Sequence, residues 1–538
     1  METILKTDNA FSAIDKINAN FAECNTGGAD VKIEDSITGA GDDAVRYYFP
    51  AKPGDYIHIH FPNGGWNTKS SRESYNKFAF GWRDNNDTLT AMGGLLCPEP
   101  WPVPSYGYDL YLSDDITNMK DAYLLFRASS GTSVPFVLTW LSKTEMKDYF
   151  ADEMADTVAK VRARQGTRTA TIMVCTDLHY RDVYEQYRPF APYSSHGMGL
   201  TMKEFARRIR VDNVFCLGDA IDGLFTVARS KMDARDMARV FSGIGVPLMY
   251  AIGNHDDNRY YNKQDGDRIF TRQEIHAEFI QQVDERTSVG GAMQGCNYYR
   301  DIDRLGIRFI VLMSINFSGQ YYFTNDTQNF LTATFNSMPE GYKAVIFTHP
   351  PLLPSHTYST ATTINGGTAV SNIIASNLDK FLALFYGHTH FDAQWMSPFV
   401  EINVGCAKVY NTENGTPGEN APEGAYFCER AAGDYREQLW DVVVIDQVNS
   451  LLSCIRFGAG VDRYIHLNPV EVAAGGTATL TPSVLTAASW ETRTSEASSI
   501  SIEGGVVSVD AGATSGTRLT AMALDANGNR EIWTIKVA

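Results

Sequence analysis

Five short polar motifs between residues 171 and 390 carry the side chains best suited to chemistry. They read Asp177-Leu178-His179, Gly218-Asp219, Gly253-Asn254-His255-Asp256, Thr348-His349 and Gly387-His388-Thr389-His390. With Asp256 set aside, the motifs hold two aspartates, one asparagine and five histidines, and no cysteine. Singly, each motif is an ordinary turn or cap, since Gly-Asp and Gly-Asn are common turn dipeptides. Any function therefore rests on the set taken together.

The side chains in this set are ligands for metal ions. Carboxylate, amide and imidazole groups suit borderline divalent metals such as Mn, Fe, Zn or Ni. Eight such groups are too many for one tetrahedral site with an open position, but they fit two metals that share a bridging carboxylate. Two cations a few ångströms apart clamp a phosphoryl group and activate a water molecule. The inventory predicts a dinuclear centre and leaves the metal open.

Hydrophobic runs must position these motifs. Four motifs directly follow a clear run, and the run before the last motif is weaker, because residues 378–385 could also end a helix. Short β-rich runs that end in polar residues indicate buried strands, whose carboxyl ends converge at one sheet edge. Candidate helices alternate with these strands, as βαβ units require. These helices span residues 202–210, 227–241, 272–283, 327–336 and 370–378.

In this order, the five motifs resemble those of the calcineurin-like metallophosphoesterase superfamily, over roughly residues 168–410. The resemblance implies an α/β fold with a four-layer αββα core. It also implies that one metal is held by Asp177, His179 and His390, and the other by Asn254, His349 and His388. Asp219 would bridge the two metals. His255 would bind no metal and would instead face the substrate and assist the leaving group.

The loops after the motifs carry tyrosines and histidines that could contact a substrate. Tyr180 and His196 follow the first motif, and His356 follows the fourth. Their alternative role is ordinary loop packing. Asp222 could orient a metal ligand, or it could cap a helix.

Composition limits the classes of function. A formal net charge of −17 argues against general nucleic-acid binding, because a polyanion would be repelled. Eight scattered cysteines show no C-x-x-C spacing and no disulfide framework. No apolar stretch approaches the roughly 18 residues of a membrane span, and no secretory signal is evident. We therefore expect synthesis in the cytoplasm before any assembly.

A chain of 538 residues is long enough for several domains. The expected divisions are a helical arm (1–27), a β-sandwich (28–141), a linker helix (142–165), the catalytic domain (166–466) and an immunoglobulin-like β-sandwich (467–538). The last assignment rests on a resemblance to bacterial immunoglobulin-like domains. If its tryptophans were exposed, the first sandwich could bind glycans; tryptophan in a sandwich is more often core.

The helical arm adds a cellular context. Residues 15–23 resemble N-terminal segments of phage and prophage tail proteins, although a helix that merely caps the next domain fits equally well. We therefore expect a phosphoesterase, more of diesters than of monoesters, that acts on cell-surface polymers such as teichoic acid in a virion tail or at a cell surface. The alternative is a virion-structural or adhesion protein with an accessory phosphoesterase. The arm leaves a homo-oligomer open.

Overall fold

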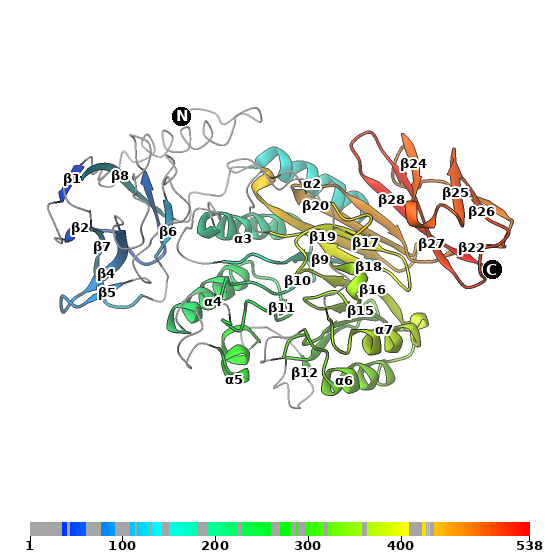
Figure 1. Cartoon of the computed structure of the whole chain (residues 1–538), viewed down its shortest axis with the longest axis horizontal. Helices are drawn as coiled ribbons and strands as arrows, with labels where there is room; N and C mark the ends of the chain where they lie inside the picture. The colour runs from blue at the N-terminus through cyan, green and yellow to red at the C-terminus, as the bar shows by residue number, and fades with distance from the viewer. Residues whose placement is uncertain are drawn as a thin grey trace.

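The structure is a computed structural model that describes most of the chain (Figure 1). The described residues are 35–39, 44–60, 77–91, 108–112, 116–127, 132–142, 150–180, 191–223, 227–259, 269–280, 287–288, 296–316, 321–357, 363–407, 422–426, 428, 430 and 435–538. The helical arm predicted at residues 1–27 lies outside them. Within them, no helix is both long and apolar enough to cross a membrane.

A large mixed sheet forms one layer of the core. Three parallel strands begin it: β11 (Leu248–Tyr250), β10 (Asn213–Cys216) and β9 (Thr169–Cys175). Two antiparallel strands continue it: β19 (Leu439–Asp446) and β20 (Leu451–Gly458). All residues of β9, β10 and β11 are buried, as expected for parallel strands covered on both faces.

A second, seven-stranded sheet forms the facing layer. In sheet order its strands are β12 (Thr287–Ser288), β13 (Tyr298–Ile302), β14 (Ile307–Val311), β15 (Lys343–Phe347), β16 (Phe381–Tyr386), β18 (Glu401–Val404) and β17 (Asp392–Trp395). Strands β14, β15, β16 and β18 are parallel. Residues 381–386 are therefore a strand, which settles the alternative of a helix end.

Aromatic side chains join the two sheets face to face. Phe215 of β10 stacks on Phe347 of β15 with ring centroids 3.7 Å apart, and Phe309 of β14 meets Phe215 edge-on at 5.3 Å. Stacked and edge-on contacts of this kind add to the free energy gained by burying the rings. Side chains of both sheets belong to one hydrophobic cluster, so the two layers share a core.

Helices cover the outer faces of both sheets (Figure 1). Those packed with the first sheet are α2 (Ala151–Arg164), α3 (Ala191–Arg208) and α4 (Val227–Ser242). Those packed on the second are α6 (Asn325–Asn336) and α7 (Gly367–Ala375). A short helix, α5 (Arg272–Ile275), continues as a π-helix over His276–Ile280. The predicted four-layer arrangement is thus present in the described residues.

The linker helix predicted at 142–165 is wrong at its start. Ser142 ends strand β8 (Thr132–Ser142), and the helix α2 begins at Ala151. The strand-forming run includes Ser142 itself. The helical spacing of the later apolar residues therefore does not reach back to Ser142, where the prediction began the helix. Helix α3 shows the opposite error, since it begins at Ala191 rather than at residue 202.

Two four-stranded antiparallel sheets precede the core. One has the order β1 (Asp35–Gly39), β8, β3 (Asp55–His60) and β6 (Tyr108–Tyr111). The other has the order β2 (Ala44–Phe49), β7 (Met119–Arg127), β4 (Lys77–Asp84) and β5 (Leu89–Ala91). Additional β-sheets before the core are therefore present, as the alternating runs predict.

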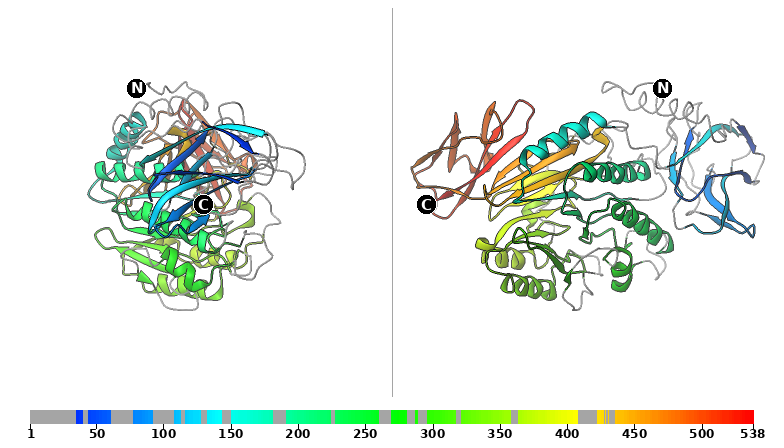
Figure 2. Two further views of the ribbon diagram at one scale, coloured as in Figure 1. Left: turned by 90° about the vertical axis from the view of Figure 1, so that its left-hand side faces the viewer. Right: turned by 180° about the vertical axis from the view of Figure 1, so that it is seen from behind.

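The C-terminal lobe, residues 467–538, is joined to the core by a shared sheet. Strand β28 (Arg530–Val537) pairs in parallel with β21 (Arg463–His466), which pairs with β20, and Figure 2 shows β28 in red beside the orange core strands. β28 also pairs with β22 (Val470–Val472) and β27 (Arg518–Leu524), and β27 pairs with β24 (Ser489–Thr492). A three-stranded sheet holds β23 (Thr477–Thr479), β26 (Val506–Val509) and β25 (Ile500–Glu503). The lobe is β-rich as predicted, but its immunoglobulin-like identity is not supported.

Candidate metal centre

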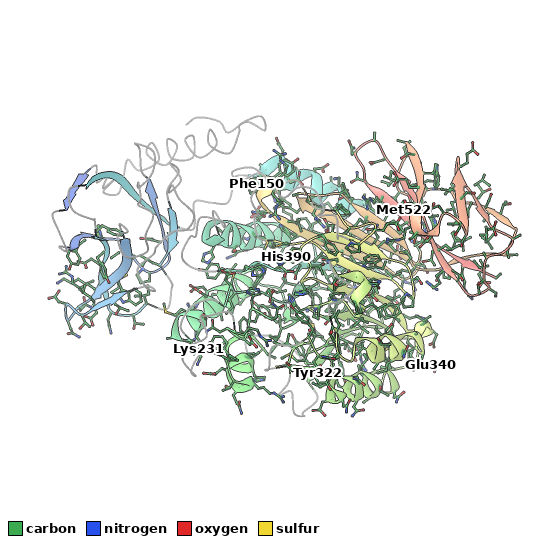
Figure 3. All side chains as sticks on the ribbon, viewed as in Figure 1. Phe150, Lys231, Tyr322, Glu340, His390 and Met522 are labelled. Atoms are coloured by element: carbon green, nitrogen blue, oxygen red, sulfur yellow. The ribbon has the colours of Figure 1, made fainter. Side chains whose placement is uncertain are left out.

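The five motifs meet because the strands before them are in register. Cys175, Cys216 and Tyr250 lie side by side at the carboxyl ends of three parallel strands of the first sheet. Phe347 and Phe385 are paired at the carboxyl ends of β15 and β16 in the second sheet. Each motif starts within a few residues of these positions. Figure 3 labels His390, from the last motif, near the middle of the molecule.

Ligand atoms gather into three groups, each with atoms within 4.8 Å of one another. The first group holds Asp177, His179, Asp219 and His390; the second holds Asp219, His349 and His388; the third holds His179, Asp222 and His255. Asp219 belongs to the first two groups, and together these two groups hold the ligands implied by the sequence resemblance except Asn254. The assignment of each residue to a particular metal stays a prediction.

In the first group, the imidazole rings of His179 and His390 lie next to each other, and His390 lies next to the Asp177 carboxylate. His179 Nε2 lies 3.0 Å from His390 Nε2, and His390 Nε2 lies 3.1 Å from Asp177 Oδ1. On the other side of its ring, His179 Nδ1 lies 3.3 Å from Asp222 Oδ1. The Asp222 carboxylate therefore faces the outer edge of the ring and can orient it, which is the first of its two predicted roles.

The second group shows that a cation fits the site. His349 Nδ1 lies 2.8 Å from the Leu217 carbonyl oxygen, which can only accept, so Nδ1 carries a proton and donates. His349 Nε2 then faces Asn254 Oδ1 at 3.0 Å and Asp219 Oδ2 at 3.2 Å. Both oxygens are acceptors. A positive charge, from a proton or a metal ion, must lie among these atoms, and the donor set suits a divalent metal.

His255 belongs to the third group, although the resemblance implies that it binds no metal. Its Nδ1 lies 2.8 Å from the Asp222 carbonyl oxygen, to which it donates, and its backbone N–H donates to Asp219 Oδ1 at 2.7 Å. The His255 ring meets the His179 ring edge-on, with centroids 4.4 Å apart. With Nδ1 held by the carbonyl, Nε2 is the His255 atom suited to exchange a proton with a ligand.

The centre is buried on one side and accessible on the other. The side chains of Asp177, Asp219 and His349 are at most 1% exposed. His390 retains 20% of its side-chain exposure, and His255 and His388 are partly exposed. The histidine side is therefore the more exposed side of the centre.

The backbone at the motifs adopts a conformation that non-glycine residues rarely use. Five motif residues have positive φ angles: Asp177 (54°), His179 (47°), Asp219 (49°), His388 (70°) and His390 (60°). Such a conformation costs on the order of 1–3 kcal/mol for each non-glycine residue and is typically kept at functional sites. All five residues belong to the first or the second ligand group.

The motif glycines are required because other elements pass too close. A Cβ at Gly218, where φ is +98°, would lie 2.6 Å from His349 Nδ1. A Cβ at Gly253 would overlap Asp219 Oδ1. A Cβ at Gly387 would overlap Thr176 Oγ1 and lie 2.5 Å from Asp177 Oδ2. Each glycine therefore lets two motifs approach within ligand distance.

Charge coupling within the centre shifts its pKa values. Burial raises the pKa of the Asp177 carboxyl, but His390 and His349 outweigh it and lower that pKa to about 2. Burial lowers the pKa of His349, but the Asp219 carboxylate outweighs it and raises that pKa to about 9. Burial and the neighbouring His349 lower the pKa of His388 to about 3. The buried Asp177 and Asp219 carboxylates therefore stabilise a positive charge next to them. When no metal ion is bound, the proton on His349 supplies that charge.

Sequence reasoning set Asp256 aside, but this residue holds two motifs together. Its carboxylate accepts hydrogen bonds from the backbone N–H groups of Asp219, Ile221 and Gly253, at 3.0, 3.2 and 2.8 Å. Its place inside the third motif was the available signal. Tyr321, whose ring lies 4.5 Å from the His388 ring, was missed because no motif marks it.

The loop candidates turn out to be packing residues. Tyr180 is fully buried and stacks on His196, which is 2% exposed, with ring centroids 5.2 Å apart. His356 is 5% exposed and stacks on Trp395. These side chains are therefore not placed to meet a substrate, and the alternative role of loop packing holds for all three.

A family model described as calcineurin-like phosphoesterase matches residues 170–392, which contain every motif residue described above. Residues 170–392 are a calcineurin-like phosphoesterase domain. No curated protein matched the chain. The match leaves the sheets before the phosphoesterase domain and the C-terminal lobe unassigned.

Solved structures of low identity resemble the chain in part. A dimetal phosphatase from Danio rerio is 15% identical, with a TM-score of 0.42, covering 56% of this chain and 99% of that one. GAP50 from Plasmodium is 9% identical, with a TM-score of 0.33, covering 53% and 84%. A phosphopantetheinyl hydrolase from Mycobacterium tuberculosis is 11% identical, with a TM-score of 0.27, covering 45% and 91%. None of these likenesses bears on the substrate.

Proposed function

We propose that this chain hydrolyses phosphate esters with two divalent metal ions held at the motif loops. The observation that carries the proposal is the position of Asp219, whose carboxylate belongs to both the first and the second ligand group. A carboxylate shared between two ligand groups is the arrangement that a dinuclear centre needs. Two bound cations would neutralise charge on the phosphoryl oxygens and lower the pKa of a water molecule.

The protein's own residues supply orientation and proton transfer. The Leu217 carbonyl fixes the His349 ring, and the Asp222 carbonyl fixes the His255 ring. We assign His255 to the departing oxygen, because its partly exposed ring borders the centre and its Nε2 can donate a proton. General acid catalysis of this kind contributes roughly 10²–10⁴-fold to the rate.

For the substrate, we propose a phosphodiester in preference to a monoester. A monoester carries a second negative charge, and a cationic side chain beside the two metals would stabilise it further. Arg259, which follows the third motif, is already paired with the buried Asp257 carboxylate and donates to the Asn316 carbonyl oxygen at 2.8 Å. Among the described residues, Arg259 is thus committed to Asp257 and Asn316, and this favours the diester.

We further propose that the natural substrate is a phosphodiester-linked surface polymer, such as teichoic acid, met by a virion-tail or surface enzyme. The support is the presence of β-sheets on both sides of the phosphoesterase domain, together with the tail-like sequence of residues 15–23. The rival role is structural or adhesive.

The test uses the full chain loaded with Mn²⁺, Zn²⁺ or Ni²⁺ and a panel of aryl phosphomonoesters, aryl phosphodiesters and purified teichoic acid. We expect turnover of the aryl diester, abolished by Asp219→Ala and by His388→Ala. His255→Ala should lower kcat by roughly 10²–10⁴-fold while metal analysis still finds two ions per chain. Bound metal without turnover of any ester would favour the structural or adhesive role. Loss of metal from His255→Ala would instead make His255 a ligand.

A further inference from the structure

The loop that carries His388 and His390 is held by residues beyond the family match. Asn403 Nδ2, from β18, donates to Thr389 Oγ1, between the two histidines. The Trp395 indole N–H, from the end of β17, donates to the Tyr386 hydroxyl at 2.7 Å. Tyr386 directly precedes the motif, and β17 begins two residues after it. The Trp395 side chain thus ties the two ends of this loop together.

Trp395 is itself packed between two other parts of the molecule. The His356 ring stacks on it almost parallel, at 3°, with centroids 4.1 Å apart. His356 follows the His349 motif and lies 3.1 Å from the buried Glu401 carboxylate. The Arg493 guanidinium also lies over the Trp395 ring, 4.7 Å from its centroid. Trp395 therefore links two ligand-bearing loops to a cation from elsewhere in the chain.

That cation comes from the C-terminal lobe. Arg493 precedes a short 3-10 helix (Thr494–Glu496) of the lobe and is only 7% exposed. It donates hydrogen bonds to the backbone oxygens of Gln394, on β17, and of Glu423, at 2.7 Å for the latter. Nearby, Gln394 Nε2 lies 3.9 Å from Met522 Sδ of the lobe, and Figure 3 labels Met522.

The neighbouring segment is held to the lobe as well. Tyr426 exchanges two backbone hydrogen bonds of 2.9 Å with Asp392, the first residue of β17. The Arg530 guanidinium of β28 lies 4.3 Å from the Tyr426 ring centroid. Strand β17 is therefore connected to the lobe at its first residue, through Tyr426, and near its last residue, through Arg493.

We propose that Arg493 is a positioning residue for the metal centre: through Trp395 and Gln394, the C-terminal lobe sets the placement of His388 and His390. This inference rests on the proposed dinuclear function. A guanidinium over an aromatic ring is attracted to it electrostatically, and the attraction is stronger when the pair is shielded from water, as it is for the nearly buried Arg493. Residues that orient metal ligands typically change metal affinity by 10–100-fold when replaced.

The experiment measures Mn²⁺ binding by calorimetry on the full chain, with urea unfolding in EDTA as the separate readout of stability. We expect Arg493→Ala to weaken Mn²⁺ binding about tenfold or more. Arg493→Lys, which keeps a cation that can reach the ring, should recover part of the loss. Trp395→Phe keeps a ring for stacking but lacks the N–H donor to Tyr386, and should weaken binding in the same direction.

The matched control is Arg518→Ala. Arg518 also crosses from the lobe to the core, donating to the Met396 backbone oxygen at 3.1 Å, but it is not stacked on Trp395. We expect it to lower stability in EDTA and to leave Mn²⁺ affinity within about twofold of the unmodified protein. Should Arg493→Ala fail to fold, Arg493→Lys and Trp395→Phe still decide the matter.

Two failures are distinguishable. If the unmodified protein binds no Mn²⁺, Zn²⁺ or Ni²⁺, the proposed function falls and the inference falls with it. If it binds metal and the Arg493 and Trp395 variants bind equally well, with only their urea midpoints lowered, Arg493 is a structural residue and the inference alone is overturned.

Discussion

The pKa of His349 shows how burial and neighbouring charges act together in the candidate centre. Its ring is fully buried, its Nδ1 is committed to the Leu217 carbonyl, and its Nε2 faces two oxygen acceptors. Burial by itself would lower the pKa of His349, yet Asp219 raises it to about 9. In the metal-free protein at neutral pH, a proton therefore occupies the place that a metal ion requires.

This competition predicts how metal affinity depends on pH. Below pH 9, a metal ion must displace the His349 proton, so the apparent affinity should fall by about tenfold for each pH unit below 9 and level off above it. Calorimetry at pH 6, 7 and 8, in buffers of different ionisation enthalpy, measures both the affinity and the protons released. An affinity independent of pH over this range would contradict the proposed competition.

The residues that gather at the centre could be predicted from the sequence, because the five motifs occur in the order typical of the resembled family. The residues that hold these side chains in place could not be predicted from the sequence. Asp256 holds its neighbours through backbone N–H groups, and Tyr321 reaches His388 from a distant loop. The reach of Asp256 to Asp219 and the contact of Tyr321 with His388 have no local spacing that marks them, so both became visible only with the tertiary structure.

At the level of the elements, the centre depends on how closely the strand ends approach one another. The backbone at Gly387 passes so near Thr176 and Asp177 that no side chain fits between them. Because the φ angle of Gly387 is not among the positive ones, the requirement for glycine there is purely steric. A methyl group at this position would have to separate the first and last motifs.

Gly387→Ala should therefore lose metal. Overpacking a well-packed interior typically costs 1–3 kcal/mol, and here the displaced atoms include the Asp177 carboxylate. We expect a Mn²⁺ content below one ion per chain and little diester hydrolysis. Gly166→Ala is the control, since its new methyl group meets nothing within 4 Å and its φ is not positive. Full metal content in Gly387→Ala would show that the strand ends tolerate separation.

Elements were predictable where the local pattern was strong. The runs at 214–217 and 381–386 are strands close to their expected bounds, and α4 covers 227–242. The start of α2 was misplaced because a strand and a helix follow one another closely there. Strand partners were not predictable, since pairing β28 with β21 depends on non-local packing rather than on either sequence alone.

At the scale of the whole molecule, one carboxylate links the C-terminal lobe to the core sheet. Glu531 of β28 is fully buried and accepts hydrogen bonds from His466 Nε2 of β21 at 2.8 Å and from backbone N–H groups of residues 483–485. Burial raises the pKa of Glu531, but these hydrogen bonds outweigh it and lower that pKa to about 2 from an ordinary 4.5.

The depressed pKa makes this junction sensitive to acid. Above pH 5 the carboxylate contributes its full stabilisation, and between pH 4.5 and about 2 the unfolded chain binds the extra proton, so stability falls with falling pH. The loss is at most about 3 kcal/mol. Urea midpoints at pH 6, 4 and 3 should fall less steeply for Glu531→Gln than for the unmodified chain. Glu471→Gln, which removes an exposed pair with Lys536, should leave the slope unchanged.

The parallel pairing of β28 with β21 also sets an order of events during translation. A ribosome releases the last predicted metal ligand, His390, long before it releases Arg530–Val537, the strand that pairs with the free edge of β21. Until then the nascent chain carries β21 with one edge unpaired, and an unpaired edge invites association with other chains. A chain truncated before Arg530 would therefore expose that edge although it already carries all the motif histidines.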